Sequence, residues 1–363
     1  MRGDPPLLNR LALILCAPLV IAAAPPTASP DARPDDSAAP DLQAAQAPAA
    51  TEAPPKPAAP AGGKGTSAGR IVGGYDAPYG KRPWQAEIKT APDYVATGKP
   101  KYTRAELRRA PEAIWTHLCG GALIADDWIL TAAHCVTPGE QAKGLLVQLG
   151  TQDLRTPGWF FTMDRIIPNP LWEREGGPED IALAHLVPAA GHKVPVGPRA
   201  YRPIPVAGIA ANFDPSAPGQ EVLVTGWGRT TPADPNAAMA KRGKRGRVVV
   251  ERPVTPPVLQ EVKLTVVDRP NCARRLRAAG ERFEDADLVG AICAEGPPGK
   301  DSCNGDSGGP MVRERSRKEY VLVGLVSWGA AHCGAAPGVY TMLESYPKWI
   351  RQVMGDAVTR LAR

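Results

Sequence analysis

The composition of the chain changes near residue 70, and this change limits what each part can fold into. Between residues 25 and 69 the sequence is mostly Ala, Pro, Asp and Gly, with Leu42 as its only large apolar side chain. Such a segment buries too little apolar surface to offset the entropy lost on folding. We therefore predict that residues 25–70 form a disordered propeptide or linker, and that residues 71–363 form the folded domain. The 41 prolines and 37 glycines of the whole chain favour a loop-rich β domain over a helical bundle.

A short apolar run lies at the N-terminus. Arg2 and Arg10 precede the run 11–24, which is the order of charge and hydrophobicity of a secretory signal peptide. The run is shorter than the roughly 20 apolar residues that span a bilayer, and Pro18 interrupts it. We expect residues 1–24 to be a signal peptide, no stable membrane insertion, and a secreted, periplasmic or extracellular protein. If the segment is retained, the alternative is a surface-tethered protein on a proline-rich stalk.

Six of the seven cysteines follow residue 118. An even number in an exported chain predicts disulfides. The sequence leaves many pairings open, although the short interval between Cys119 and Cys135 makes that bridge easy to close. No C-x-x-C spacing occurs, so we expect no metal site and no cofactor.

The net charge of +6 does not by itself indicate a nucleic-acid partner, because most basic residues are dispersed. One cluster gathers Lys241, Arg242, Lys244, Arg245 and Arg247 between Ala-rich and Pro-rich segments. It is either a solvated loop or a site for a polyanion. The second interpretation defines an alternative function, a catalytically silent polyanion-binding protein.

Three segments carry side chains that suit nucleophilic catalysis. Ser307 lies among the glycines of residues 305–309, where a substrate can approach the backbone closely. A serine hydroxyl is a weak nucleophile unless a base accepts its proton, and that base needs an orienting acceptor. His134 follows an apolar segment and precedes Cys135, and Asp180 begins an alternating pattern that predicts a half-buried strand.

The sequence resembles the trypsin and chymotrypsin family of serine proteases in four motifs taken in order: IVGG at 71–74, TAAHC at 131–135, DIAL at 180–183 and GDSGGP at 305–310. Three shorter motifs, GWG at 226–228, SWG at 327–329 and PGVY at 337–340, continue the likeness to about residue 354.

The resemblance implies an all-β fold for residues 71–363, with two packed six-stranded antiparallel β-barrels and a C-terminal helix. Local patterns agree with this fold. Strands are expected over 145–149, 221–225 and 320–326, and a closing helix through Trp349, Val353, Ala357 and Leu361.

The resemblance also implies the roles of individual residues. Ser307 would be the nucleophile, His134 the general base and then acid, and Asp180 the buried carboxylate that orients the imidazole. The N–H groups of Gly305 and Ser307 would form the oxyanion hole. The disulfides that the resemblance implies are Cys119–Cys135, Cys272–Cys293 and Cys303–Cys333.

Asp301 occupies the position that, in this family, lies at the base of the pocket for the side chain before the scissile bond. A desolvated carboxylate there selects a cation, so the resemblance implies a serine endopeptidase that cuts after Arg or Lys. Ser302 would help to solvate a lysine. Further substrate contacts are implied for Ser327, Trp328, Gly329 and Gly338, the two glycines leaving the pocket deep.

Cleavage between Arg70 and Ile71 would free an α-ammonium that, by the same resemblance, inserts and pairs with Asp306. The precursor is then nearly inactive, and the mature enzyme can cut its own precursor. His117 aligns where some relatives use a histidine to hold this carboxylate before cleavage.

Two segments depart from the family. Residues 90–116 are longer than in digestive trypsins, and they either narrow substrate choice or form a tolerated insertion. The segment after residue 150 lacks spaced acidic ligands, so no calcium requirement is expected. The partners we expect are protein or peptide substrates and protein protease inhibitors, with no nucleic acid and a monomeric enzyme.

Overall fold

The computed structural model describes residues 72–90, 116–136, 144–156, 158–173, 177–189, 201–209, 214, 217–229, 239–242, 248–251, 256–316 and 319–355. All of them belong to one of two compact units, Ala58–Arg363. The predicted signal peptide, the linker and the Arg70–Ile71 bond lie outside the described residues, as do most of segment 90–116 and part of the basic cluster.

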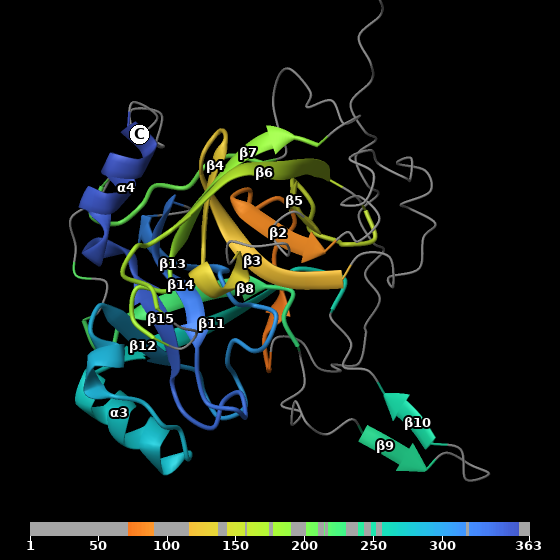
Figure 1. The fold of residues 1–363 in the computed structure, drawn as a ribbon. Coiled ribbons are helices and arrows are strands. Elements are labelled where there is room, and N and C mark those ends of the chain that lie inside the picture. Colours follow the sequence, from red (N-terminus) through yellow and green to blue (C-terminus); the bar gives the residue numbers. More distant parts are fainter. Residues whose placement is uncertain are drawn as a thin grey trace, which may run out of the picture. The chain divides into compact units, whose positions relative to one another are not determined.

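The first barrel is closed and antiparallel (Figure 1). Its strand order is β2-β3-β4-β7-β6-β5, and β2 also pairs with β5, so that Ala86 lies opposite Leu149. Apolar side chains such as Ile88 and Leu123 fill its interior. The strands are β2 (Gln85–Thr90), β3 (Thr116–Ala125), β4 (Trp128–Thr131), β5 (Leu145–Leu149), β6 (Trp159–Pro168) and β7 (Ala182–Pro188).

The second barrel is also closed, because β8 pairs with both β13 and β11. The remaining order is β11-β12-β15-β14-β13, and the short strand β1 (Tyr75–Asp76) pairs with β11. Val224, Leu264 and Tyr340 are among the buried residues of its interior. The strands are β8 (Glu221–Gly226), β11 (Gln260–Val267), β12 (Ala291–Glu295), β13 (Pro310–Ser316), β14 (Glu319–Trp328) and β15 (Gly338–Met342).

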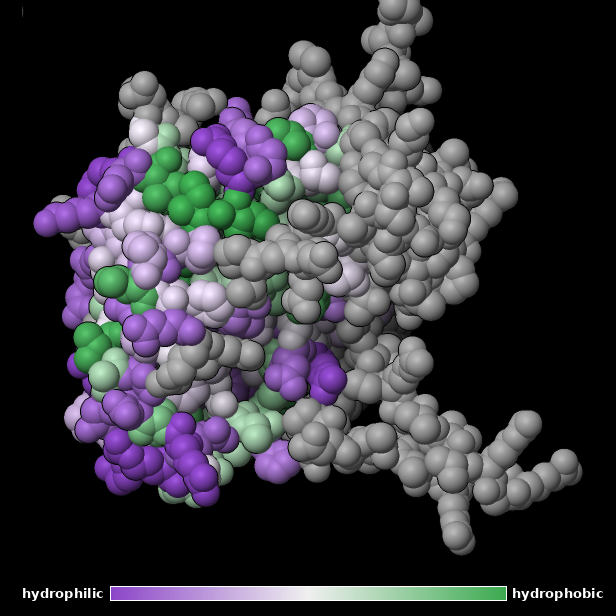
Figure 2. Space-filling view, in the orientation of Figure 1, coloured by the Kyte–Doolittle hydropathy of each residue, from purple (hydrophilic) through white to green (hydrophobic). Residues whose placement is uncertain are grey.

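Short helices and one hairpin join these strands. Helix α3 (Arg269–Ala278) begins at Asp268, whose side chain accepts a hydrogen bond from Asn271 N, and its exposed side is hydrophilic (Figure 2). The other elements are η2 (Ala133–Cys135), η4 (Asp285–Leu288), η5 (Leu343–Ser345), α4 (Pro347–Met354) and the paired strands β9 (Met239–Arg242) and β10 (Val248–Glu251).

The two barrels share a buried apolar layer. Ile124 and Leu183 of the first barrel pack in one cluster with Leu325 of the second barrel and with Ile350 of α4. Thr225 Oγ1 on β8 also donates a hydrogen bond of 2.6 Å to Gln85 Oε1 on β2. The C-terminal helix therefore closes the layer between the barrels.

The predicted fold class is confirmed, with two closed six-stranded antiparallel barrels and a short C-terminal helix. Strand 145–149 has the predicted bounds. The strands predicted over 221–225 and 320–326 are slightly longer, as β8 and β14. Trp349 and Val353 lie on α4, whereas the predicted continuation through residues 357 and 361 lies outside the described residues.

The half-buried strand predicted to start at Asp180 differs from the structure in its start and in its first half. Strand β7 begins at Ala182, and its first three residues are all fully buried. Ala182 and Ala184 face the interior of the first barrel, while Leu183 packs in the layer between the barrels. The first half of the strand is therefore covered on both faces, whereas from His185 onward partly exposed residues alternate with the buried Leu186, as predicted.

We predict that Leu183→Ala lowers the free energy of unfolding by about 2–5 kcal/mol, because it leaves a cavity in the layer between the barrels. Urea denaturation followed by tryptophan fluorescence measures the change. Leu171→Ala is the matched control, since Leu171 is 68% exposed, and it should cost less than about 0.5 kcal/mol. Equal effects of the two substitutions would contradict the placement of Leu183.

Candidate active site

His134 and Asp180 form a pair at the edge of the first barrel. His134 lies in η2, directly after β4, and the disulfide Cys119–Cys135 ties this turn to β3. The ring Nδ1 of His134 lies 2.8 Å from Asp180 Oδ2, and its backbone N–H donates to Asp180 Oδ1 at 3.0 Å. One carboxylate thus orients both the ring and the backbone of His134.

The second barrel also holds Asp180, which is 1% exposed. Ser327 Oγ on β14 donates to Asp180 Oδ2 at 2.6 Å, and Thr341 Oγ1 on β15 donates to the Asp180 carbonyl at 2.9 Å. Burial acts to raise the pKa of the Asp180 carboxyl, but the hydrogen bonds and charge of His134 and the Ser327 hydroxyl outweigh it and lower this pKa. The group is therefore ionised at neutral pH and favours the His134 tautomer with a proton on Nδ1.

Ser307 lies on a tight turn before β13. Gly305 and Gly308 have φ angles of 98° and 72°, which glycine adopts without strain. A Cβ at Gly308 would lie 2.1 Å from Thr131 Oγ1 and 2.9 Å from Ala132 N, so this turn packs directly against the segment that leads to His134. The Ser307 carbonyl accepts a hydrogen bond from Gly120 N on β3.

A cavity of about 150 Å³ extends from Ser307 to Asp301. Asp301 is 5% exposed; its Oδ2 accepts a hydrogen bond from Gly334 N at 2.9 Å, and its Oδ1 accepts none from the described residues. Burial raises the pKa of Asp301 to about 7, although the N–H groups of Gly334 and Ser302 act in the opposite direction. The predicted contact residues Ser302, Ser327, Trp328, Gly329 and Gly338 all line this cavity.

Two contacts with Tyr340 in the wall of this cavity were not predicted from the sequence. The Ser302 hydroxyl is paired with the Tyr340 hydroxyl at 2.8 Å, so it is engaged by the barrel as well as facing the cavity. At Gly338 a Cβ would lie 2.9 Å from Tyr340 Oη, so glycine there is required by packing in addition to pocket depth.

Asp306, next to Ser307, is completely buried. Its two carboxylate oxygens accept hydrogen bonds from Gly228 N at 2.8 Å and Cys303 N at 2.9 Å. Burial raises the pKa of Asp306 to about 6, against the effect of these N–H groups and of His117. Any side chain at Gly226 or Gly228 would overlap this carboxylate, since a Cβ there would lie 2.1 or 2.4 Å from its atoms.

Several contacts were missed by the sequence analysis. The GWG motif gave no sign that its glycines surround Asp306, and Thr341 lies in no motif that indicates a contact with Asp180. His117 was expected to hold the Asp306 carboxylate, but its Nε2 lies 2.8 Å from the Gly305 carbonyl instead, and its Nδ1 lies 3.3 Å from Glu87 Oε1.

The three disulfides of the described residues are the three pairs that the resemblance implied, Cys119–Cys135, Cys272–Cys293 and Cys303–Cys333. In the described part of the chain, one group of possible metal-binding atoms lies close together, on Cys119, His134 and Cys135. Both sulfur atoms belong to a disulfide, so neither is available as a thiolate ligand.

Among the described helices, none is long and apolar enough to cross a membrane.

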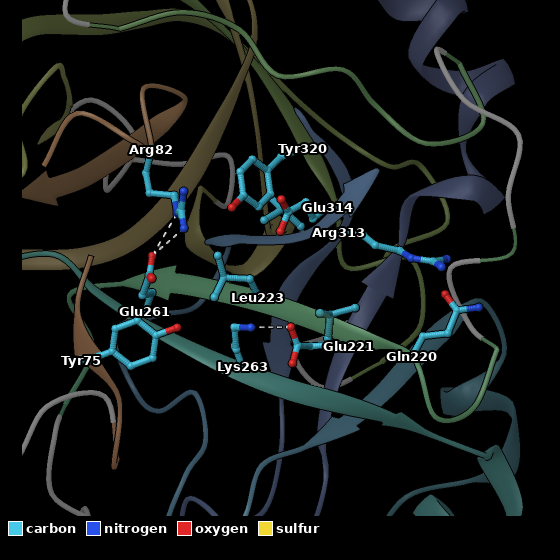
Figure 3. Close-up of a pocket in the computed structure, with 12 residues that line it drawn as sticks. Tyr75, Arg82, Gln220, Glu221, Leu223, Glu261, Lys263, Arg313, Glu314 and Tyr320 are labelled. Atoms are coloured by element: carbon cyan, nitrogen blue, oxygen red, sulfur yellow. Dashed lines mark hydrogen bonds and ion pairs between the residues drawn. The ribbon is translucent and has the colours of Figure 1, made fainter. Parts of the chain in front are cut away.

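A larger hollow, of about 370 Å³, lies apart from these residues, along β8, β11 and β13 (Figure 3). Arg82 and Glu261 form an ion pair of 2.8 Å at one side of it, and Lys263 and Glu221 form another of 2.6 Å. None of the predicted site residues lines this hollow. We therefore place the candidate active site at the cavity between Ser307 and Asp301.

The fold, the disulfides and this site define a trypsin-like serine protease. The chain belongs to the trypsin family, since the family model named Trypsin matches residues 71–350.

Known relatives agree with this assignment. Vitamin K-dependent protein C of Mus musculus is 33% identical over 293 residues, which are 79% of this chain and 52% of that protein. The Rattus norvegicus protein of the same name is 32% identical over the same coverage. The chain therefore spans about half the length of these curated relatives. The solved structure of neuropsin, a serine protease expressed in the limbic system of mouse brain, matches with a TM-score of 0.54 and 26% identity, covering 78% of this chain and 100% of that chain.

We predict that the cation benzamidinium binds this cavity less tightly as the pH falls through about 7, because protonation removes the charge of Asp301. Below the pKa the dissociation constant should rise about tenfold per pH unit. Calorimetric titration of the Ile71-terminated protein at several pH values measures it, with Asp301→Asn as the control that should bind weakly at every pH. A constant affinity across this range would contradict the prediction.

Proposed function

We propose that the protein is a secreted serine endopeptidase that hydrolyses peptide bonds after Arg or Lys through an acyl-enzyme. The observation that carries this proposal is the His134–Asp180 pair, which groups of both barrels orient. Beside it, the turn of Ser307 packs at Gly308 against Thr131 and Ala132, just before His134 in the chain. Membership of the trypsin family supports it.

In the proposed mechanism His134 accepts the proton of the Ser307 hydroxyl as the serine oxygen attacks the scissile carbonyl. The Asp180 carboxylate stabilises the imidazolium that forms, and the N–H groups of Gly305 and Ser307 donate to the developing oxyanion. His134 then protonates the leaving amine. In the second half of the cycle it activates a water molecule that hydrolyses the acyl-enzyme.

The proposed specificity rests on Asp301. A buried carboxylate whose Oδ1 accepts no hydrogen bond from the described residues favours a ligand that brings a positive charge and N–H donors. Arg and Lys side chains supply both, whereas an aromatic side chain would leave this oxygen unpaired.

We further propose that the enzyme is made as a zymogen. Val72, the residue after Ile71, is buried, and its carbonyl accepts a hydrogen bond of 3.1 Å from Asp301 N. The new N-terminus would thus form beside the base of the cavity. Asp306, buried with no cation among its hydrogen-bond partners, is suited to pair with the freed Ile71 ammonium.

The remaining proposals concern the whole chain. Residues 1–24 would direct export, residues 25–70 would form a propeptide or linker, and residues 71–363 the protease domain. Three disulfides suit an oxidising compartment outside the cytoplasm. Partners would be protein or peptide substrates and protein protease inhibitors, and the enzyme would act as a monomer.

We predict that Ser307→Ala lowers kcat for Arg and Lys reporter peptides by about 10⁶-fold, because it removes the nucleophile. Hydrolysis of peptides with Arg, Lys or Phe before the reporter measures both activity and specificity. Ser316→Ala is the matched control, since this hydroxyl contacts the exposed Glu319 and should leave the rate unchanged. A protein that folds, fails to react with a fluorophosphonate and binds heparin would instead be the catalytically silent homologue, and preferential cleavage after Phe would contradict the specificity.

We predict that Arg70→Gln keeps the chain uncut and nearly inactive, because no Ile71 ammonium becomes available for Asp306. A trypsin-treated sample of the unaltered chain, with its new N-terminus verified by sequencing, should gain activity. Full activity of the uncut Arg70→Gln variant would show that cleavage is not required.

A further inference from the structure

One wall of the candidate active-site cavity is formed largely by a loop. Residues 328–331 line the cavity, but β14 ends at Trp328 and β15 begins only at Gly338. Residues 329–332 lie in no helix or strand, so no β-ladder holds them in place. Contacts with other parts of the chain must therefore fix the wall segment 328–331.

The turn that follows helix α3 has a defined backbone geometry. Gly280 has a φ angle of 91°, in the left-handed region that favours glycine. Its N–H donates to the Arg277 carbonyl at 3.0 Å, and the N–H of Glu281 donates to the Leu276 carbonyl at 3.1 Å. These are the two hydrogen bonds of a Schellman motif, so the end of the helix itself fixes the backbone of Glu281.

Helix α3 is in turn fixed to the second barrel. The disulfide Cys272–Cys293 joins it to β12, beside which it lies (Figure 1). Leu276 of the helix is fully buried in an apolar cluster, and Trp328 and Ala330 of the wall segment pack against the same cluster. The helix and the wall of the cavity therefore share one packed layer.

Two side chains after α3 contact the wall segment directly. Glu281 Oε1 accepts a hydrogen bond of 2.9 Å from Ala331 N, which lies 50 positions further along the chain. The ring centroids of Phe283 and Trp328 lie 5.6 Å apart, and the guanidinium carbon of Arg277 lies 4.8 Å from the Phe283 centroid. The turn thus contacts both ends of the wall segment.

From these contacts we infer that Glu281 is a positioning residue for substrate binding, because its carboxyl oxygen fixes Ala331 in the wall of the cavity. This inference rests on the proposed function, in which the Arg or Lys side chain of a substrate enters that cavity. A wall that is in place for only part of the time lowers the apparent affinity by the same fraction. The hydrogen bonds that orient His134 come from Asp180, so the chemical step should not depend on Glu281.

The kinetic test compares Glu281→Ala, which removes the acceptor, with Glu281→Gln, which keeps an acceptor oxygen, in the Ile71-terminated enzyme. We expect Glu281→Ala to raise KM for Arg and Lys reporter peptides by about two- to tenfold, the effect of losing one hydrogen bond. The value of kcat should change by less than about twofold, and Glu281→Gln should restore most of KM. Glu319→Ala is the matched control, since Glu319 contacts Ser316 at the opposite end of β14.

Three kinetic outcomes would overturn the positioning role. The first is an unchanged KM in Glu281→Ala. The second is a fall in kcat as large as the rise in KM, which would show that the contact supports the catalytic groups rather than the wall. The third is an equal rise in KM for Glu281→Gln, which would assign the effect to the charge rather than to the hydrogen bond.

The second test needs no catalysis and therefore separates this inference from the proposed function. It uses the protein cut at Arg70–Ile71 and carrying Ser307→Ala, titrated calorimetrically with benzamidine. Adding Glu281→Ala should raise the dissociation constant of benzamidine by about two- to tenfold, and adding Glu281→Gln should change it by less than about twofold. Amide hydrogen exchange, followed by ¹⁵N NMR, should become faster at Ala331 with Glu281→Ala and not with Glu281→Gln.

Either an unchanged benzamidine affinity or unchanged exchange at Ala331 in the Glu281→Ala protein would overturn the inference. If both expected changes occur in a protein whose Ser307 form cleaves no peptide, the inference stands and the proposed function fails.

Discussion

Both barrels converge on the carboxylate of Asp180. From its own barrel this carboxylate accepts hydrogen bonds from the ring Nδ1 and the backbone N–H of His134. From the other barrel it accepts a hydrogen bond from the Ser327 hydroxyl. A buried anion is stable only when such donors satisfy it, so the pairing of the barrels and the ionisation of this group depend on each other. The direction of the His134 ring follows from that single carboxylate.

The same requirement applies to the other buried acids, and each is satisfied differently. Asp306 accepts two backbone N–H groups, which leaves its charge without a cation among these partners. Asp301 accepts the Gly334 N–H on one oxygen only. Glu87 has two basic neighbours. The first two are suited to receive a positive charge from elsewhere, and the third is already balanced. These buried carboxylates therefore differ in whether a basic side chain already lies beside them.

Motifs allowed much of the site to be predicted from sequence, and periodicity allowed little. The segment around Ser307 contains glycines at positions 305 and 308, whose positive φ angles favour glycine, and the segments around His134 and Asp180 match the family's motifs in order. Strand patterns were less informative. The alternation after Asp180 suggested one exposed face, yet the first three residues of β7 are covered on both sides because Leu183 packs in the layer between the barrels. Burial from a distant element leaves no local mark on a sequence.

The sequence by itself predicted a disulfide-bonded β domain, the pairing of its cysteines by resemblance, and the side chains that we propose for catalysis. Only the tertiary structure decided how those side chains are held: that β8 closes its barrel through β11 and β13, that the glycines of GWG surround Asp306, and that His117 contacts the Gly305 carbonyl. The reason is physical. A motif records what one short segment must contain, whereas a contact between residues separated by more than a hundred positions depends on the packing of all the strands between them.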